Sequence, residues 1–142
     1  MTNDSNPNMV ALDMSSAFDT CRFDVMFSKL ERRLPAIVIH TLIFSYQQQY
    51  AWVKWGNSSE FNIFSITNGT KQGSVLSPAL FSVYVQDLLN ELRELGVCCH
   101  VVGAFLGAVG RADDFLFLAP HRAAMQQMLD LAADFGRRNN LL

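Results

Sequence analysis

The chain has little charge, no long hydrophobic run and no obvious division into parts. Charged residues make up 17% of its 142 residues and hydrophobic residues 50%. No apolar run approaches the roughly 20 residues that cross a bilayer, and the first eight residues, MTNDSNPN, contain no basic side chain. We therefore expect no membrane span, signal peptide or transit peptide. Since no repeat or linker is visible, we expect a polar segment over residues 1–8 and one domain over residues 9–142.

A basic excess is also missing, which argues against a nucleic-acid surface. Lys and Arg number 11 against 13 Asp and Glu, so the formal net charge is −2. Proteins that bind phosphate backbones usually present a basic face. Any nucleic-acid function must therefore be supported by specific motifs rather than by overall charge.

Cysteine and histidine are too few, and too irregularly spaced, to suggest a zinc site. Cys21, Cys98 and Cys99 show no metal-ligand spacing. Neighbouring residues on a strand point to opposite faces, so Cys98 and Cys99 are poor disulfide partners. We expect three reduced, partly buried thiols in an intracellular protein. The three histidines show no ligand spacing either, and we assign them no chemistry: His40, His100 and His121.

Apolar periodicity predicts helices packed on an antiparallel sheet, an α+β fold. We expect strands over residues 9–12 and 115–118, a hairpin of 50–55 with 61–67, and two strands over 97–102 and 103–112. Helices are expected over 23–34, from 36 to about 46, from 77 to 95 with Ser77 as N-cap, and after Pro120. Their apolar stripes should supply the core.

Three acidic residues stand at the ends of these apolar strands. Asp13 ends the first strand, and Asp113 and Asp114 lie where two apolar strands turn. An ordinary polar turn would explain the acidic pair alone, since Asp is common in turns. Together with Asp13, however, the pair could hold two divalent cations, as phosphoryl and nucleotidyl transfer require.

Three sequence motifs occur in a fixed order around these acids. They are ALDMSSAFD at residues 11–19, KQGSVLSP at 71–78 and ADD at 112–114. The set resembles motifs A, B and C of the reverse transcriptases of non-LTR (LINE-type) retrotransposons, and the resemblance covers the chain from about Val10 onward. It implies the ferredoxin-like palm core of an RNA-directed DNA polymerase, with fingers and thumb largely missing from these residues.

The resemblance implies a metal site with oxygen ligands. Asp13, Asp113 and Asp114 would bind two Mg²⁺ or Mn²⁺ ions, and the backbone carbonyl of Met14 would be a further ligand. One ion would lower the pKa of the primer 3′-hydroxyl, and the other would steady the leaving triphosphate.

The resemblance also implies contacts to the incoming nucleotide. Phe18 would lie under the sugar, and Gln72 and Gly73 would contact the templating base pair. Two plainer interpretations remain open: Phe18 is a core aromatic residue, and Gln72 and Gly73 belong to an ordinary loop before a helix.

One residue departs from the family pattern. Arg111 stands two residues before Asp113, where the family has an aromatic residue, above all tyrosine. A positive charge beside the metal site is expected to weaken or abolish activity.

The leading hypothesis is a fragment of an RNA-directed DNA polymerase. It would use an RNA template, a DNA primer and dNTPs, with fingers and thumb supplied by a longer polyprotein and a nuclear location by analogy. One alternative is a catalytically dead remnant that acts at most as an interaction module. The other is a metal-dependent nuclease or phosphatase that uses the same acids.

Overall fold

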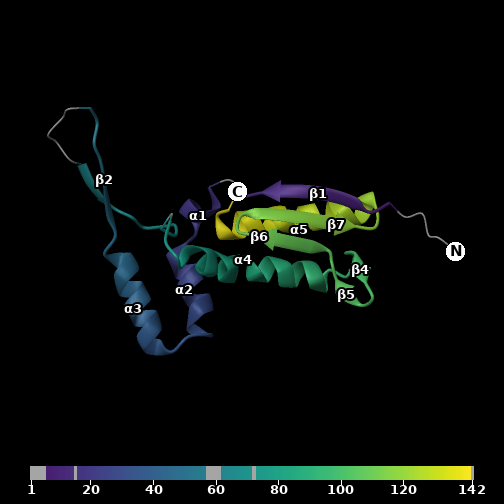
Figure 1. Cartoon of the computed structure of the whole chain (residues 1–142), viewed down its shortest axis with the longest axis horizontal. Coiled ribbons are helices and arrows are strands. Elements are labelled where there is room, and N and C mark those ends of the chain that lie inside the picture. Colours follow the sequence, from purple (N-terminus) through teal and green to yellow (C-terminus); the bar gives the residue numbers. More distant parts are fainter. Residues whose placement is uncertain (1–5, 15, 57–61, 72, 142) are drawn as a thin grey trace.

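The computed structural model describes residues 6–14, 16–56, 62–71 and 73–141 and shows an α+β fold (Figure 1). The elements in chain order are β1 (Asn8–Asp13), α1 (Ala17–Thr20), α2 (Phe23–Glu31), α3 (Ala36–Gln47), β2 (Tyr50–Val53), β3 (Asn62–Ser65), α4 (Ser77–Glu94), β4 (His100–Val101), β5 (Ala104–Phe105), β6 (Ala108–Arg111), β7 (Asp114–Ala119) and α5 (Arg122–Asn139).

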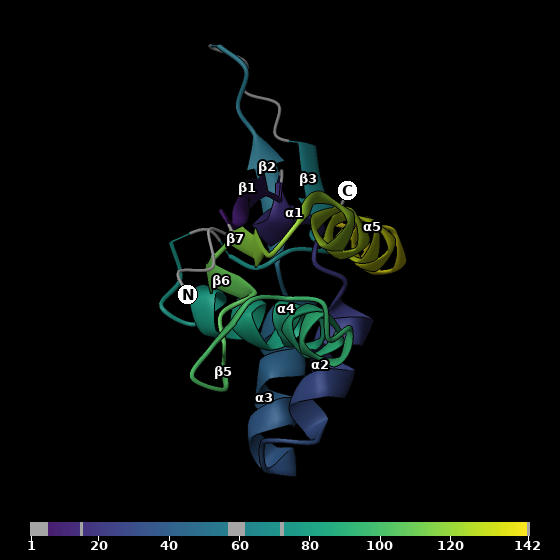
Figure 2. The same cartoon turned by 90° about the vertical axis from the view of Figure 1, so that its right-hand side faces the viewer.

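The centre of the fold is a three-stranded antiparallel sheet in the order β1-β7-β6. Side chains alternate between its two faces, as the pleat requires. On β7, Phe115, Phe117 and Ala119 are buried, whereas Asp114 is exposed. Figures 1 and 2 show α4 and α5 packed on one side of this sheet. The buried face of β7 therefore lies against helices, and the acidic residue faces away from them.

The two long helices bury the stripes that their sequences predict. On α4 the buried residues recur at three- and four-residue intervals, as on one face of a helix: Phe81, Tyr84, Leu88 and Leu92. On α5 they are Met125, Met128, Ala132 and Phe135. These stripes face one another and the sheet, so the predicted helical layer is confirmed.

The helix starts differ from prediction. The N-cap of α4 is Leu76, which makes no side-chain cap, and not Ser77. The Ser77 hydroxyl instead donates to the carbonyl of Lys71 at 2.6 Å, which ties α4 to the preceding loop. At α5, His121 is a cap that the sequence did not suggest, because its Nδ1 accepts from the N–H of Ala124 at 3.1 Å.

The strands predicted over 97–102 and 103–112 are wrong in their extent. Val102 and Gly103 have left-handed φ angles of 49° and 78°, so the chain turns there. Within the described part of the chain, the short strands β4 and β5 on either side pair only with each other. Of the expected second strand, only β6 joins the central sheet. Hydrophobicity alone could not show this turn, because Val102 is an unusual residue for a positive φ.

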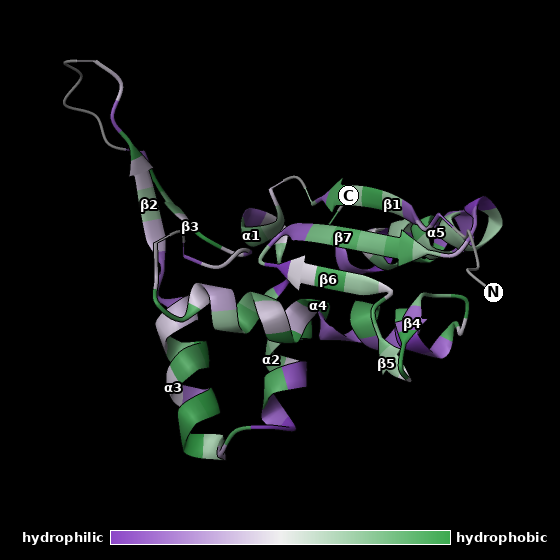
Figure 3. Cartoon of the chain, turned by 45° about the vertical axis from the view of Figure 1, so that its right-hand side comes forward, coloured by the Kyte–Doolittle hydropathy of each residue, from purple (hydrophilic) through white to green (hydrophobic). Residues whose placement is uncertain are grey.

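The hairpin of β2 and β3 forms as predicted and extends away from the sheet, beyond the end of α3 (Figures 1 and 2). Several of its large side chains are exposed, among them Trp52 and Ile63. Figure 3 shows that α3 is largely hydrophobic. Two of its large apolar side chains, Ile37 and Phe44, are exposed.

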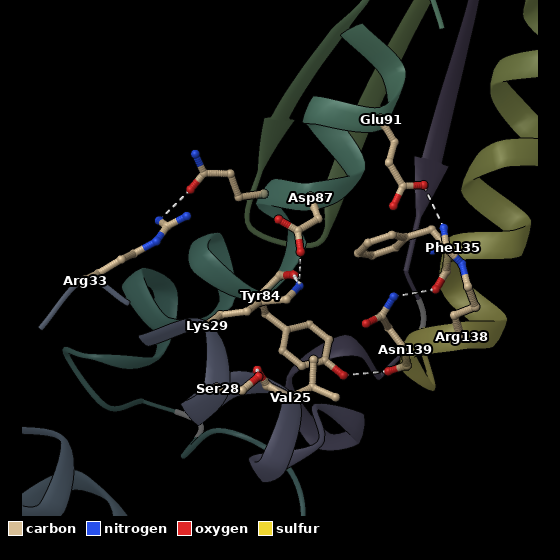
Figure 4. Close-up of polar contacts among 11 residues, drawn as sticks. Val25, Ser28, Lys29, Arg33, Tyr84, Asp87, Glu91, Phe135, Arg138 and Asn139 are labelled. Carbon is tan, nitrogen blue, oxygen red and sulfur yellow. Dashed lines mark hydrogen bonds and ion pairs between the residues drawn. The ribbon is translucent and has the colours of Figure 1, made fainter. Parts of the chain in front are cut away.

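Tyr84 connects three helices beneath the sheet (Figure 4). Its hydroxyl donates to the carbonyl of Asn139 at 2.7 Å and accepts from the N–H of Arg22 at 3.3 Å. The ammonium of Lys29 on α2 donates to the Tyr84 carbonyl at 2.5 Å and lies 3.0 Å from a carboxylate oxygen of Asp87. These contacts join the start of α2 and the end of α5 to α4.

The three cysteines are free thiols, as expected. Within the described residues no helix combines the length and apolar character needed to cross a membrane.

Candidate active site

Strand pairing brings the three predicted acids together at one end of the sheet. Asp13 is the direct register partner of Asp114 on the neighbouring strand. Residues paired in this way have side chains on the same face, with Cβ atoms roughly 4.5–5.5 Å apart. The N–H of Met14 donates to the carbonyl of Asp113 at 3.2 Å, which fixes the end of β1 against the β6–β7 turn. The expected proximity of these acids is therefore present in the backbone.

The turn itself is tighter than the sequence suggested. Ala112, with a left-handed φ of 56°, and Asp113 form the connection, whereas Asp114 is already the first residue of β7. Asp114 pairs with Asp13 on one side and with Arg111 on the other. Arg111, the residue that departs from the family pattern, is thus placed beside the acids.

The outward face of the sheet is hollowed at this point. A depression of about 420 Å³ has Asp13, Asp114 and Arg111 among the described residues that line it. The remaining lining comes from apolar neighbours on the same three strands, such as Val109 and Leu116. The depression is therefore an open groove, whose described lining contains two acids and one base.

The donor chemistry of this groove suits a hard divalent cation, because Mg²⁺ and Mn²⁺ prefer carboxylate oxygens. The three acids come from two adjacent strands and one turn, as a shared site requires. In the described part of the chain, however, no three His, Cys, Asp or Glu side chains are gathered closely enough to hold a metal ion. The ligands are present in type and in backbone position, but their side chains do not enclose an ion.

Met14 and Phe18 have structural contacts of their own. Met14 is buried, and its carbonyl accepts from the N–H of Ala17 at 3.2 Å at the start of α1. The Phe18 ring is half-buried and lies 4.8 Å from the Phe81 ring, centroid to centroid. The described residues that line the acidic groove do not include Phe18. The core interpretation of Phe18 thus has direct support, and its role under a sugar stays a prediction.

The motif B loop, residues 68–74, is attached to the end of motif A. The N–H of Thr70 donates to the carbonyl of Phe18 at 2.6 Å, and the N–H of Gly69 to that of Cys21 at 2.8 Å. Gly73 is exposed, whereas Gln72 lies outside the described residues. Thr70 directly precedes the motif at residues 71–78 and was not predicted from the sequence as a site residue.

Cys21 is a buried residue that follows the motif A segment. Its thiol donates to the carbonyl of Ala17 at 3.1 Å. Burial raises the pKa of this thiol to about 12, so it stays protonated at neutral pH. A neutral thiol is a poor nucleophile, which supports a packing role.

Comparison with known proteins identifies the family. The sequence profile described as "Reverse transcriptase (RNA-dependent DNA polymerase)" matches residues 2–142. The chain belongs to this family. Reverse transcriptases of this family generally use divalent metal ions, in agreement with the acidic groove.

Two relatives place the chain among reverse transcriptases of non-LTR retrotransposons, and so confirm the resemblance seen in its motifs. It is 27% identical over 132 residues to the retrovirus-related Pol polyprotein from type-1 retrotransposable element R2 of Popillia japonica. This match covers 92% of the present chain and 19% of that polyprotein. It is 38% identical over 73 residues to the retrovirus-related Pol polyprotein from type-2 retrotransposable element R2DM of Drosophila melanogaster. That match covers 51% of the present chain and 7% of the polyprotein. This reverse transcriptase chain thus spans less than a fifth of either polyprotein.

The fold has a solved counterpart. The apo telomerase from Candida tropicalis, truncated from its C-terminal domain, superposes with a TM-score of 0.66 at 13% identity and covers 89% of this chain and 27% of the other. The likeness shows a shared fold and confirms the polymerase palm architecture that the motifs predicted.

Proposed function

We propose that this chain is the catalytic palm region of an RNA-directed DNA polymerase, with Asp13, Asp113 and Asp114 as its metal ligands. The observation that carries the proposal is the direct pairing of Asp13 with Asp114 across adjacent strands. The hydrogen bond from Met14 to the Asp113 carbonyl supports it, because it holds the third acid at the same sheet end.

The groove would hold two Mg²⁺ or Mn²⁺ ions. When bound, such ions supply Lewis-acid activation of the primer 3′-hydroxyl and stabilise the leaving pyrophosphate. The protein's contribution is to place two carboxylates on the outward face and a third at the turn. Met14 would add its carbonyl oxygen through the lone pair that Ala17 does not use.

The substrates would be an RNA template, a DNA primer and dNTPs. Phe18, Gln72 and Gly73 would contact the incoming nucleotide, since the motif B loop is hydrogen-bonded to the Phe18 carbonyl. The near-neutral charge of the chain is compatible with this role if a longer polyprotein supplies fingers and thumb with basic surface. A nuclear location follows only from the analogy with elements that copy into chromosomal DNA.

A second candidate is a catalytically dead remnant, and one observation favours it. Arg111 lines the same groove as Asp13 and Asp114 and is the register partner of Asp114. A fixed cation at that point competes electrostatically with bound metal ions. A remnant would retain the fold and lose incorporation.

Primer extension in a chimera tests the proposal. The chain is joined to fingers and thumb of a related element and assayed on an RNA template with Mg²⁺. Asp113→Asn should abolish incorporation, because a neutral amide is a much weaker ligand for a hard cation. The matched control is Asp130→Asn on the exposed side of α5, where the Asp130 carboxylate accepts a hydrogen bond from the Gln126 amide at 2.8 Å; it should leave activity unchanged.

A chimera that folds but shows no incorporation, both with Arg111 and with Arg111→Tyr, would favour the catalytically dead remnant. Incorporation that survives Asp113→Asn would exclude the assigned metal ligands.

A further inference from the structure

We propose that a pocket beside the motif B loop binds one unpaired nucleobase, with Gln49 as its principal recognition residue. The inference rests on the proposed function, because it takes the ligand to be nucleic acid. The pocket has a volume of about 320 Å³ and is separate in its lining from the acidic groove. Volumes of roughly 300–1,000 Å³ are usual for small-molecule sites.

Gln49 is the feature that points to a ligand. It is 6% exposed, and its side-chain Nε2 has no hydrogen-bond partner among the described residues. A buried amide donor without a partner is costly and rare in folded proteins. Its backbone is held in place, because its carbonyl accepts from the N–H of Ile66 at 2.9 Å. Gln49 therefore lines the pocket from a fixed backbone position, and its buried side-chain donor has no partner among the described residues.

A second part of the pocket lining is also held by backbone hydrogen bonds. It consists of Asn68, Gly69, Thr70 and Lys71, the first part of the motif B loop. The N–H groups of Gly69 and Thr70 donate to the carbonyls of Cys21 and Phe18, at 2.8 and 2.6 Å. The pocket thus lies between the base of the β2–β3 hairpin and a loop that is part of the proposed template site.

The lining favours a base over a phosphate group. Among the described lining residues, the acid Asp19 and the base Lys71 cancel in formal charge. Phosphate offers only acceptors and is usually bound by several cations or backbone N–H groups. The amides of Gln49 and Asn68 each carry donors and an acceptor, which match the mixed edge of a nucleobase. The aliphatic side chain of Ile66 provides an apolar wall for the ring.

Adenine is the base that this chemistry fits best. A glutamine amide pairs in a bidentate manner with N6 and N7 of adenine. Such an edge is accessible when a base is unstacked, as it is in single-stranded RNA. We therefore assign the pocket to an unpaired adenine of a single strand close to the motif B loop.

Binding of the 142-residue chain to labelled RNA tests the assignment. The probes are a ten-nucleotide oligo(A), the same length of oligo(U), and a ten-nucleotide abasic backbone, measured by fluorescence anisotropy at fixed salt. Gln49→Leu removes the donor and retains the volume, and Gln48→Leu is the matched control, because Gln48 is the exposed neighbour. Gln49→Leu should bind oligo(A) roughly tenfold more weakly than the unaltered chain, and Gln48→Leu should bind as the unaltered chain does.

Two further measurements separate recognition from structure. Gln49→Glu retains the shape but exchanges the donor nitrogen for oxygen, so it should lose oligo(A) binding as Gln49→Leu does. In the absence of RNA, Gln49→Leu should melt no lower than the unaltered chain, because it removes an unpaired buried donor.

Equal affinity for oligo(A) and the abasic backbone would overturn the proposal, as would unchanged oligo(A) binding by both Gln49 variants. A lower melting temperature of Gln49→Leu, together with unchanged binding, would assign Gln49 to folding alone. These outcomes are distinct from failure of the polymerase proposal, which primer extension by the chimera and its Asp113→Asn variant decides. Absence of base-dependent RNA binding by the unaltered chain, together with an active chimera, would refute the pocket and leave the palm assignment standing.

Discussion

Asp13 and Asp114 are direct partners across the β1–β7 pair, and this register places the acidic groove on the outward face of the sheet. The adjacent pair, Leu12 with Phe115, points the other way, and Phe115 is buried against the helices. Because strand side chains alternate, a slip of one residue would turn Asp13 into the apolar core. Hydrophobic packing on one face of β1 thus fixes the position of a carboxylate on the other.

The attachment of motif A to the motif B loop should depend on Gly69. A Cβ at this position would lie 2.8 Å from the backbone oxygen of Asp19, and the residue has a φ of 89°. We expect Gly69→Ala to lower the free energy of unfolding by more than the ~1–2 kcal/mol that a left-handed conformation alone costs. Urea denaturation measures the difference.

Gly73 is the matched control for this change. Its φ of 80° imposes the same backbone penalty, but among the described residues no heavy atom lies within 4 Å of a built Cβ. Gly73→Ala should therefore cost only the conformational term. Equal losses in the two variants would contradict the close contact between Gly69 and Asp19.

Much of the fold was predictable because local patterns agree with tertiary contacts. The helical stripes of α4 and α5 and the strand ending at Asp13 follow apolar spacing that is visible in the sequence. The division of residues 97–112 was not predictable in this way. It depends on a left-handed Val102, which hydrophobicity does not signal, and on short strands that pair only with each other.

The site shows the same limit. Convergence of the acids could be predicted, since both carboxylate-bearing segments follow apolar strands and match ordered motifs. The burial of Gln49 could not, because Gln47, Gln48 and Gln49 are alike in sequence and only the last is covered by the hairpin base and motif B loop. The Phe18–Phe81 contact is likewise non-local.

Stability should fall at alkaline pH in part because of Cys21. Burial raises the pKa of this thiol to about 12 in the folded chain, above its usual value of 9.0. The unfolded chain therefore loses the proton first as pH rises, and deprotonation favours unfolding. The contribution of Cys21 is fully present below about pH 9 and is lost progressively as pH approaches 12. Urea midpoints at pH 7, 9 and 10 should decline less steeply in Cys21→Ala; identical slopes would refute this assignment.

The Tyr84 hydroxyl should stabilise the junction of α2, α4 and α5. Tyr84→Phe leaves the carbonyl of Asn139 and the N–H of Arg22 without their partner. We expect the free energy of unfolding to fall by about 1–3 kcal/mol, the usual cost of an unsatisfied buried polar group. Tyr50→Phe is the control: Tyr50 is 58% exposed, so its substitution should change stability by less than ~0.5 kcal/mol. A similar effect in the two variants would show that the Tyr84 hydroxyl contributes nothing specific.

Arg111 should limit polymerase activity through its place in the acidic groove. Purified alone, the 142-residue chain is expected to show little or no templated incorporation, because it corresponds to less than a fifth of either Pol polyprotein that it matches. A chimera with fingers and thumb should recover activity only in part, since the Arg111 cation stands beside Asp114. Arg111→Tyr in that chimera should raise the rate by about tenfold or more, because each ~1.4 kcal/mol of restored transition-state stabilisation gives a factor of ten.

If the positive charge of Arg111 limits activity, two further variants should differ in rate. Arg111→Lys keeps the positive charge and should leave the rate low, whereas Arg111→Gln removes it and should recover part of the gain seen with tyrosine. The same order should appear in the Mn²⁺ concentration that half-saturates the rate, because a nearby cation weakens binding of a second one. Primer extension on an RNA template across a Mn²⁺ series measures both quantities. Full activity of the unaltered chain alone would show that fingers and thumb are dispensable, and an unchanged rate in Arg111→Tyr and Arg111→Gln would remove Arg111 as the cause of low activity.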